Sequence, residues 1–197
     1  MKSMHGIRRA WGPIGLCLTW ILAGCAGRAT PFSDYRDPEW QPQREMRVAV
    51  LPLENLTTAP NAGVVVAQLL GTELYARGLF RQSGEEDARV LLSGNPVEKD
   101  RRTKGAESTR ELAEKLGVEA LLSGSVSEFA YQHGLREEPV VGMRLTLTRA
   151  KDGRVLWQAG HALRGGGVLQ RSTLISTAQQ AIRDLVGSLD AATRPAP

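Results

Sequence analysis

Apolar and polar positions alternate, or recur at helical spacing, through most of the chain between Met46 and residue 190. The first such stretch is apolar on both faces of an extended chain, with Val48 and Val50 on one face and Ala49, Leu51 and Leu53 on the other. A stretch of this kind predicts a strand that is covered on both sides. Pro52 has no N–H for a β-ladder, so we place it at the end of the strand.

A helix is predicted between Asn61, a candidate N-cap, and Gly78, a candidate C-terminal stop. Its apolar face consists of Val66, Leu69, Leu70 and Leu74. The β-branched run 64–66 leaves a strand as the competing interpretation, although the later spacing favours a helix. A short strand at 79–82 is the next candidate element.

Residues 83–104 carry no clear pattern and end in a charged loop. Ser108 and Glu111 then have the spacing of a capping box, which predicts the start of a helix. The core stripe of this helix is formed by Leu112, Ala113 and Leu116, and Gly117 ends it.

Three strands follow, at 120–131, 140–148 and 155–159. A two-residue turn before the last strand would place Trp157 on the polar face. A three-residue loop, Lys151 to Gly153, keeps one face apolar, so we predict that loop with Gly153 at positive φ. The resulting pairs are Arg149 with Val155, Leu147 with Trp157, and Leu145 with Ala159.

The strongest helical pattern comes last, after the bend Gly165 to Gly167. Its apolar residues are Ile175, Ala178, Ile182, Leu185 and Leu189. The order of elements predicts an α/β fold, a mixed β-sheet packed against helices, over residues 46–190. Residues 191–197 are expected to form a frayed tail.

The N-terminus has a different pattern: basic residues, a short apolar stretch and then small residues, which is typical of a secretory signal peptide over residues 1–24. The apolar stretch is too short and too glycine-rich for a permanent membrane-spanning helix, which needs about 20 apolar residues. The sequence at its end, Leu22, Ala23, Gly24 and Cys25, resembles the lipobox of bacterial lipoproteins.

That resemblance implies that the Cys25 thiol receives a diacylglyceryl group and that cleavage exposes its amine for acylation. Two or three acyl chains give stable anchoring in a bilayer. Ala26 follows the cysteine where an Asp would favour retention in the inner membrane, so the resemblance implies an outer-membrane lipoprotein whose domain faces the periplasm.

Residues 25–45, which include the lipidated cysteine, are predicted to form a disordered tether because they are polar, proline-rich and without apolar period. About 20 residues reach roughly 25 Å as a flexible coil and about 65 Å when stretched. Trp40 is the unusual residue of this segment, and we interpret it as a loosely docked aromatic.

Charge and cysteine content exclude several classes of function. The formal charge of +4 includes Lys2, Arg8 and Arg9 of the signal peptide, which leaves 22 basic against 21 acidic residues in the rest of the chain. A nearly neutral domain gives no electrostatic case for nucleic acid. Apart from Cys17 in the signal peptide and Cys25, the chain has no cysteine, which excludes thiolate catalysis and cysteine metal sites.

No pattern predicts an enzyme, a metal site or a cofactor site. His133 and His161 have no neighbours at the spacing of metal ligands or of a catalytic triad, and we expect His161 to be partly exposed near a strand end. The acidic runs 85–87 and 137–138 are interpreted as solvated loops. The glycines 165–167 lack the Lys-Ser/Thr of a phosphate loop, so they predict a flexible bend.

Three blocks resemble the CsgG-like and LpoB-like lipoprotein family, which shares its fold with the N-terminal domain of TolB. These are 48–55 with the helix that closes at Gly78, then 121–126, and 152–157. Pore-forming members insert membrane-spanning hairpins, whose strands need roughly 9–11 alternating residues each. The short loop 132–139 has no room for such strands, so the resemblance implies the domain without its pore.

Two functions follow from this resemblance. The first is a non-catalytic adaptor in cell-envelope biogenesis that binds an envelope partner, for example a peptidoglycan synthase that it activates. The second is a self-assembling or accessory subunit of an outer-membrane secretion system. A homo-oligomer would favour the second function, and a monomer bound to a synthase would favour the first.

Overall fold

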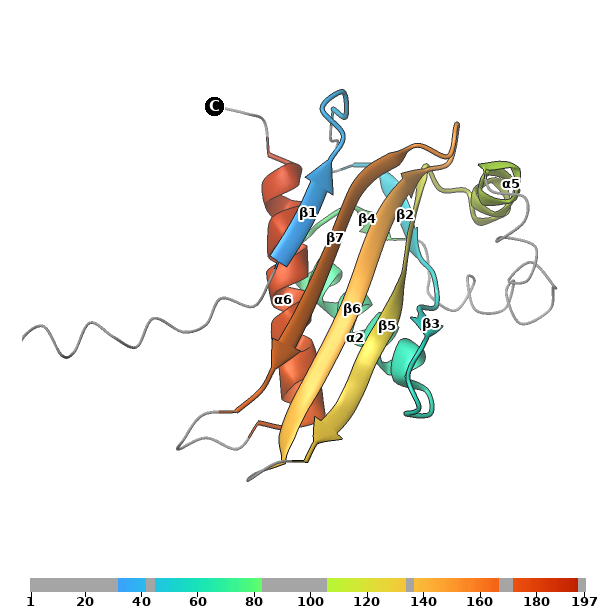
Figure 1. The fold of residues 1–197 in the computed structure, drawn as a ribbon. Coiled ribbons are helices and arrows are strands. Elements are labelled where there is room, and N and C mark those ends of the chain that lie inside the picture. Colours follow the sequence, from blue (N-terminus) through green and yellow to red (C-terminus); the bar gives the residue numbers. More distant parts are fainter. Residues whose placement is uncertain (1–31, 42–44, 83–105, 134–136, 167–171, 195–197) are drawn as a thin grey trace, which may run out of the picture.

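The structure is a computed structural model that describes residues 32–41, 45–82, 106–133, 137–166 and 172–194 (Figure 1). Segment 83–104, which carries no clear sequence pattern, lies outside these residues. The elements in chain order are β1 (Phe32–Arg36), β2 (Arg47–Val50), β3 (Glu54–Asn55), α2 (Ala62–Ala76), β4 (Arg81–Gln82), α5 (Ala106–Leu116), β5 (Ala120–Gln132), β6 (Glu138–Arg149), β7 (Val155–Arg164) and α6 (Leu174–Ala192).

The strands form one mixed seven-stranded sheet, which confirms the predicted fold class. The order is β1-β7-β6-β5-β2-β4, and the short β3 pairs with β5. Neighbours from β1 to β5 are antiparallel, whereas β2, β3 and β4 make parallel pairs. The long hairpins β5–β6 and β6–β7 occupy the middle of this strand order.

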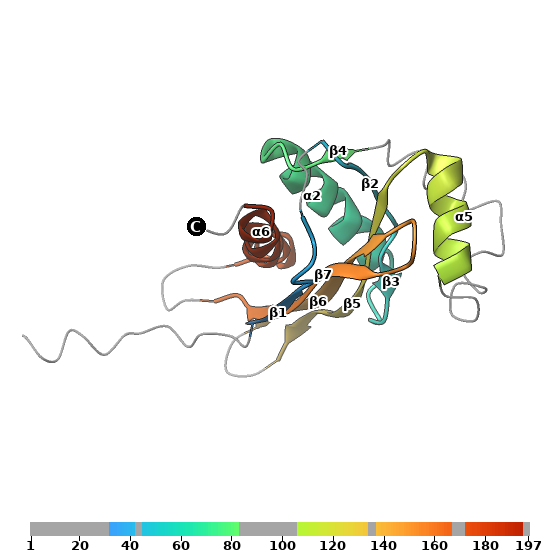
Figure 2. The same cartoon turned by 90° about the horizontal axis from the view of Figure 1, so that it is seen from above.

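Helices lie on both faces of this sheet (Figure 2). α2 and α6 lie on one face, and α5 packs beside β2 and β5 on the other face. The chain moves from β2 outward to β4 and then back past β2 to β5. Parallel crossovers are right-handed in almost all proteins, so two crossovers in opposite directions place α2 and α5 on opposite faces.

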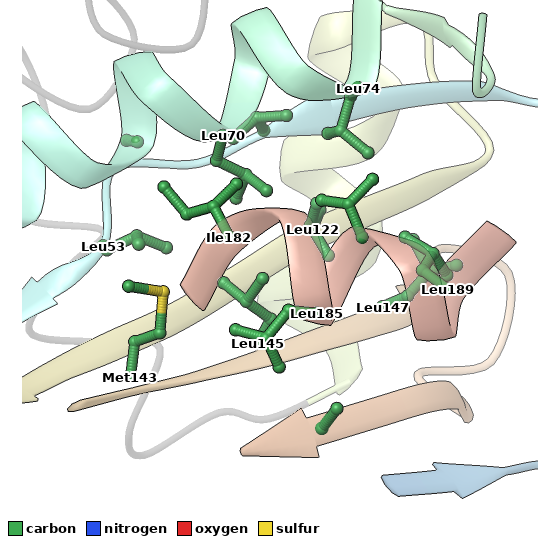
Figure 3. Close-up of a cluster of buried hydrophobic side chains, with 14 of the residues drawn as sticks. Leu53, Leu70, Leu74, Leu122, Met143, Leu145, Leu147, Ile182, Leu185 and Leu189 are labelled. Atoms are coloured by element: carbon green, nitrogen blue, oxygen red, sulfur yellow. The ribbon is translucent and has the colours of Figure 1, made fainter. Parts of the chain in front are cut away.

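The main core lies between the sheet and the two helices α2 and α6 (Figure 3). It contains Leu70 and Leu74 of α2, Leu122, Leu145, Leu147 and Trp157 of the sheet, and Ile182, Leu185 and Leu189 of α6. A smaller cluster under α5 includes Ala49, Leu51 and Leu112. Strand β2 is thus covered on both faces, as predicted, although Leu53 packs in the main core because the strand ends before Pro52.

The prediction for the turn between β6 and β7 is confirmed in part. The predicted three-residue loop is wrong, because the Arg149 N–H donates to the Arg154 carbonyl at 2.9 Å and leaves residues 150–153 in the loop. The positive φ of Gly153 and the register beyond the turn are confirmed. Gly153 has φ 72°, and Leu147 faces Trp157. The pairing of Arg149 with Val155 is wrong, because a bulge places Val155 opposite Thr148. The extra residue is Leu156, and the bulge allows Leu156 and Trp157, which are neighbours in the chain, both to lie in the main core.

The predicted helix ends are mostly confirmed. α2 has Asn61 as its N-cap, without a side-chain hydrogen bond, and Gly78 follows its end with φ 59°. Gly117, at φ 64°, follows the end of α5. The predicted capping box is wrong, because α5 begins at Ala106 and residue 108 lies within the helix.

Both predicted boundaries of the domain are too narrow. The segment predicted as a disordered tether contains β1, and Trp40 is 5% exposed in the main core instead of loosely docked. At the other end α6 extends to Ala192, and Thr193 is buried. The N-terminal end was missed because it forms no periodic apolar face, whereas at the C-terminal end the apolar face of α6 continues from Leu189 to Ala192.

The last helix confirms four of its five predicted core residues. Ala178, Ile182, Leu185 and Leu189 are buried, whereas Ile175 is 44% exposed in the first turn, where Leu174 packs against the main core instead. Thr173 caps this helix by accepting from the Ser176 N–H at 3.1 Å. Among the described residues, none of the helices combines the length and apolar content needed to cross a membrane.

Candidate interaction surfaces

The predicted lipidation motif, Leu22, Ala23, Gly24 and Cys25, lies outside the described residues, so lipidation stays a prediction. The described residues present two surfaces of interest. One is the N-terminal segment 32–41, which we call the strap. The other is a row of side chains on the outer side of α2.

The strap begins with β1, which covers the open edge of β7. Phe32 pairs with His161 and Arg36 with Trp157 in antiparallel register. Asp34 accepts a 2.6 Å hydrogen bond from Ser188 of α6. All five residues of β1 remain exposed, and a short, charged edge strand of this kind protects a sheet from edge-to-edge association.

The second half of the strap is anchored by a buried carboxylate. Asp37 is fully buried, its N–H donates to the Leu156 carbonyl at 2.9 Å, and its Oδ1 accepts from the Glu39 N–H at 3.0 Å. The turn that results directs Trp40 into the main core. The strap therefore combines a backbone ladder, a buried charge and one large aromatic side chain.

Arg154, next to the turn between β6 and β7, neutralises the buried charge. Its Nη2 donates to Asp37 Oδ1 at 2.9 Å, and its Nε lies 2.6 Å from Oδ2. Nη1 donates to Glu39 at 2.6 Å. The hydrogen bond to Glu39, with the negative charges of Asp37 and Glu39, raises the pKa of Arg154 against the opposing effect of desolvation. One guanidinium thus binds two carboxylates of the strap.

The turn itself is fixed by a second ion pair. Arg149 donates to both carboxylate oxygens of Asp152, at 3.0 and 2.6 Å, and the Arg154 N–H donates to Asp152 at 3.1 Å. These bonds, the Arg149 side chain first, lower the pKa of Asp152 to about 2. Asp152 therefore stays ionised and holds the backbone of Arg154 in position.

The outer side of α2 is unusually apolar for an exposed helix surface. Val64 is 37% exposed and Tyr75 is 82% exposed, and no charged residue occurs between Asn61 and Thr72. Residues 64, 68, 71 and 75 are spaced by four, three and four positions, which places them in one row. We call the row Val64, Gln68, Gly71 and Tyr75 the α2 stripe.

Each of the two described histidines lies beside a carboxylate. The expectation that His161 is partly exposed is wrong: it is buried between β7 and α6, with Nε2 3.2 Å from Asp184 and the Phe32 ring packed at its edge. His133 is exposed and lies 3.4 Å from Glu137. No group of three potential metal ligands occurs in the part of the chain that the structure describes.

The remaining candidates are likewise scattered. Glu138 lies 3.6 Å from Arg164, and the acidic run 85–87 is outside the described residues. The strap, in contrast, was missed by sequence reasoning. Its available signals were Trp40 within a polar segment and the Asp-Pro pair at 37–38, which is typical of a turn.

Solved structures share this fold, although no protein-family profile and no curated protein matches the chain. A PelC chain from Paraburkholderia phytofirmans, described as a dodecamer, is 25% identical, with a TM-score of 0.60, over 81% of this chain and 96% of that chain. The lipoprotein GNA1162 from Neisseria meningitidis is 17% identical, with a TM-score of 0.54, over 73% of this chain and 99% of that one.

The fold is that of known lipoproteins. The GNA1162 structure shows this at the level of architecture, which confirms the kind of fold that the sequence resemblance implied. The LpoB C-terminal domain from Escherichia coli also matches, at 13% identity and a TM-score of 0.44 over 64% of this chain and 87% of that domain. This last likeness is too weak to carry an argument.

Proposed function

We propose that the protein is a non-catalytic lipoprotein of the cell envelope, anchored to the outer membrane by acylated Cys25, which works by assembling with further copies of itself. The observation that carries this proposal is the likeness to a PelC chain that forms a dodecamer. The likeness extends over 96% of that chain, so a subunit of similar size and fold does assemble into a dodecamer. Of the two functions considered from the sequence, this favours the assembly subunit.

The α2 stripe supports the proposal from the side of this chain. A helix that is apolar all around is normally buried on all sides. α2 buries Val66, Leu70 and Leu74 against the sheet, yet Val64 and Tyr75 on the opposite side remain in contact with water. A neighbouring subunit on the α2 stripe would remove these side chains from water, which is favourable by about 25 cal/mol per Å² of apolar area.

The titratable groups support an interaction module instead of an enzyme. Among the described carboxylates and cations, the Asp37–Arg154–Glu39 and Arg149–Asp152 contacts hold the strap and a turn. An active site needs such groups to converge on a space for a substrate. Here they contact one another instead, at the buried Asp37 and in the exposed turn.

An adaptor role remains compatible with this proposal when the partner is at the outer membrane. Because the strap is docked, only residues 26–31 connect Cys25 to the folded domain. Six residues span at most about 20–25 Å, far less than the 65 Å of a free tether. We therefore place the partners near the outer membrane and disfavour a synthase that must be reached across the periplasm.

The proposal is tested by the mass of the native protein. We expect the acylated full chain, purified from membranes in mild detergent, to show a multiple of the subunit mass by native mass spectrometry. The N-terminal peptide should carry its acyl groups on Cys25, and Cys25→Ser should move the protein into the soluble fraction. A monomer at all concentrations would overturn self-assembly, and an unmodified Cys25 would overturn the anchor.

The contribution of the α2 stripe is tested with a matched pair of substitutions. Tyr75→Glu should dissociate the oligomer, since it places a charge in the α2 stripe. Tyr35→Glu, at a half-exposed tyrosine of β1, should leave the oligomer intact. Dissociation by Tyr35→Glu alone would show that the subunits meet at another surface.

A further inference from the structure

One edge of the sheet is open along the second half of β5. β2 pairs with the first residues of β5, and β3 pairs with Ser125 and Val126. The Leu56 N–H then donates to the Val126 carbonyl at 2.9 Å. Among the described residues, no strand pairs with β5 beyond Val126 on this side, and Figure 1 shows the arrowhead of β5 extending past β3. We call residues 128–132 the open edge.

The register identifies which backbone groups of the open edge point out of the sheet. The Gly165 N–H donates to the Pro139 carbonyl at 2.8 Å, so Pro139 directs its backbone groups toward β7. Pro139 lies opposite Tyr131, and two opposite residues that are not hydrogen-bonded to each other point their backbone groups in opposite directions. Tyr131 therefore directs its N–H and C=O away from β6, and Phe129, two residues earlier, does the same.

The two terminal strands of the sheet are protected against further pairing, whereas the open edge is not. β1 is short and has Asp34 and Arg36 among its exposed residues, and β4 consists of two residues, one of them Arg81. Short length and charge both discourage the addition of another strand. The open edge contains two aromatic residues and a single charged one, Glu128, at its start, and the bulge of β5 lies before it. Leu56, which is 58% exposed, adds apolar area at this start.

Two copies of the open edge are complementary to each other. In an antiparallel pair about a twofold axis at Ala130, Phe129 lies opposite Tyr131 of the second copy, so both outward residues exchange backbone hydrogen bonds. Their rings form cross-strand aromatic pairs, and Glu128 lies opposite Gln132, so no like charges face each other.

Other positions of the axis use the open edge less well. An axis at Phe129 would place Tyr131 against the bulge of β5, and an axis at Tyr131 would place Phe129 beyond the end of β5. The register about Ala130 is therefore the one that pairs the outward backbone groups of both aromatic residues.

We propose that the open edge is a dimerisation surface, at which two copies of the chain join their sheets about a twofold axis at Ala130. This contact deepens the proposed self-assembly and rests on it. The open edge joins copies in pairs, because the same residues of both copies form the contact. The α2 stripe, on a different element, then joins the pairs to one another. An assembly that uses both surfaces therefore contains an even number of copies.

The position of the axis is tested with a crosslink. Ala130→Cys in the acylated full chain places a thiol at the axis, and the folded domain has no cysteine of its own. Opposite residues of a pair that is not hydrogen-bonded have Cα atoms about 4.5 Å apart, within the range of a disulfide. Mild oxidation should yield a covalent dimer, severalfold more than for Ala162→Cys at an exposed alanine of β7. Equal crosslinking of the two variants would overturn the proposal.

Charge at the axis provides the second test, in the Tyr75→Glu background that disrupts the α2 stripe. We expect this background to form dimers by native mass spectrometry. Ala130→Lys or Ala130→Glu should convert them to monomers, because each places like charges opposite each other. A mixture of the two variants should restore the dimer, which also shows that both are folded. Ala162→Lys should leave the dimer intact. Dimers that persist with Ala130→Lys, or a mixture that stays monomeric, would overturn the proposal.

The unsubstituted chain distinguishes a failure of the dimer contact from a failure of self-assembly. If that chain is monomeric at all concentrations, the proposed self-assembly is wrong, and the dimer contact is wrong with it. If that chain assembles but its Tyr75→Glu variant is monomeric, self-assembly stands and the dimer contact alone is overturned. The same holds for an assembly with an odd number of copies.

Discussion

The strap and α6 both border strand β7, but different forces hold them there. α6 packs through a continuous apolar face, with Ile182, Leu185 and Leu189 essentially inaccessible to water. The strap leaves all five residues of β1 exposed and depends on a backbone ladder, on Asp37 and on Trp40. We therefore expect α6 to belong to the cooperative core and the strap to open by itself.

The largest expected effect is the loss of core packing under α6. Leu185 is fully buried, so Leu185→Ala should lower the free energy of unfolding by about 2–5 kcal/mol. Chemical denaturation measures this change. Ile175→Ala, at an exposed position of the same helix, should change it by less than about 0.5 kcal/mol. Similar losses for both variants would contradict the packing of α6 described above.

A smaller effect is expected for Trp40→Ala, although Trp40 is the largest apolar side chain of the strap. In a rigid core, Trp→Ala costs about 3–5 kcal/mol. The strap has an alternative, because it can undock, and the loss is then limited to its own docking free energy. We expect amide exchange to increase at residues 33–40, with a smaller loss of global stability than Leu185→Ala.

Trp40→Phe provides the control, since it keeps an aromatic ring in the core. It should preserve most of the amide protection of the strap. If Trp40→Ala destabilises the whole domain as strongly as Leu185→Ala, the strap is part of the cooperative core, and the contrast with α6 is wrong.

The same contrast explains what the sequence could predict. The spacing of Ala178, Ile182, Leu185 and Leu189 identified α6, and alternation identified the register of Leu147 with Trp157, because burial on one face leaves a local period. The strap has no such period. Its key contact joins Asp37 to Arg154, which are 117 positions apart in the chain, and no local pattern reports such a pair.

Two finer errors have related causes. Ile175 continues the period of α6 but is exposed, because Leu174 takes the place on the core side in the first turn. The bulge at Leu156 depends on how two neighbouring apolar residues both reach the core, which strict alternation forbids. The lipobox was predicted from the sequence alone. The α2 stripe could not be predicted in this way, because the sequence does not show which side of an apolar helix stays exposed to water.

The smallest effect is expected in acid, and it should distinguish the two regions again. Hydrogen bonds from the Arg149 side chain and then from the Arg154 N–H lower the pKa of Asp152 from 3.8 to about 2. A pKa that is lower in the folded state means that ionised Asp152 stabilises the fold fully above 3.8, and that this contribution is lost as the pH falls toward 2. The turn that positions Arg154 should loosen in this window, so amide exchange of the strap should rise before that of α6, whose apolar contacts bind no proton.

Asp152→Asn removes the titrating group. In this variant, the amide exchange of the strap should depend less on pH in the same window. Equal pH dependence in the two proteins would show that the turn does not connect Asp152 to the strap.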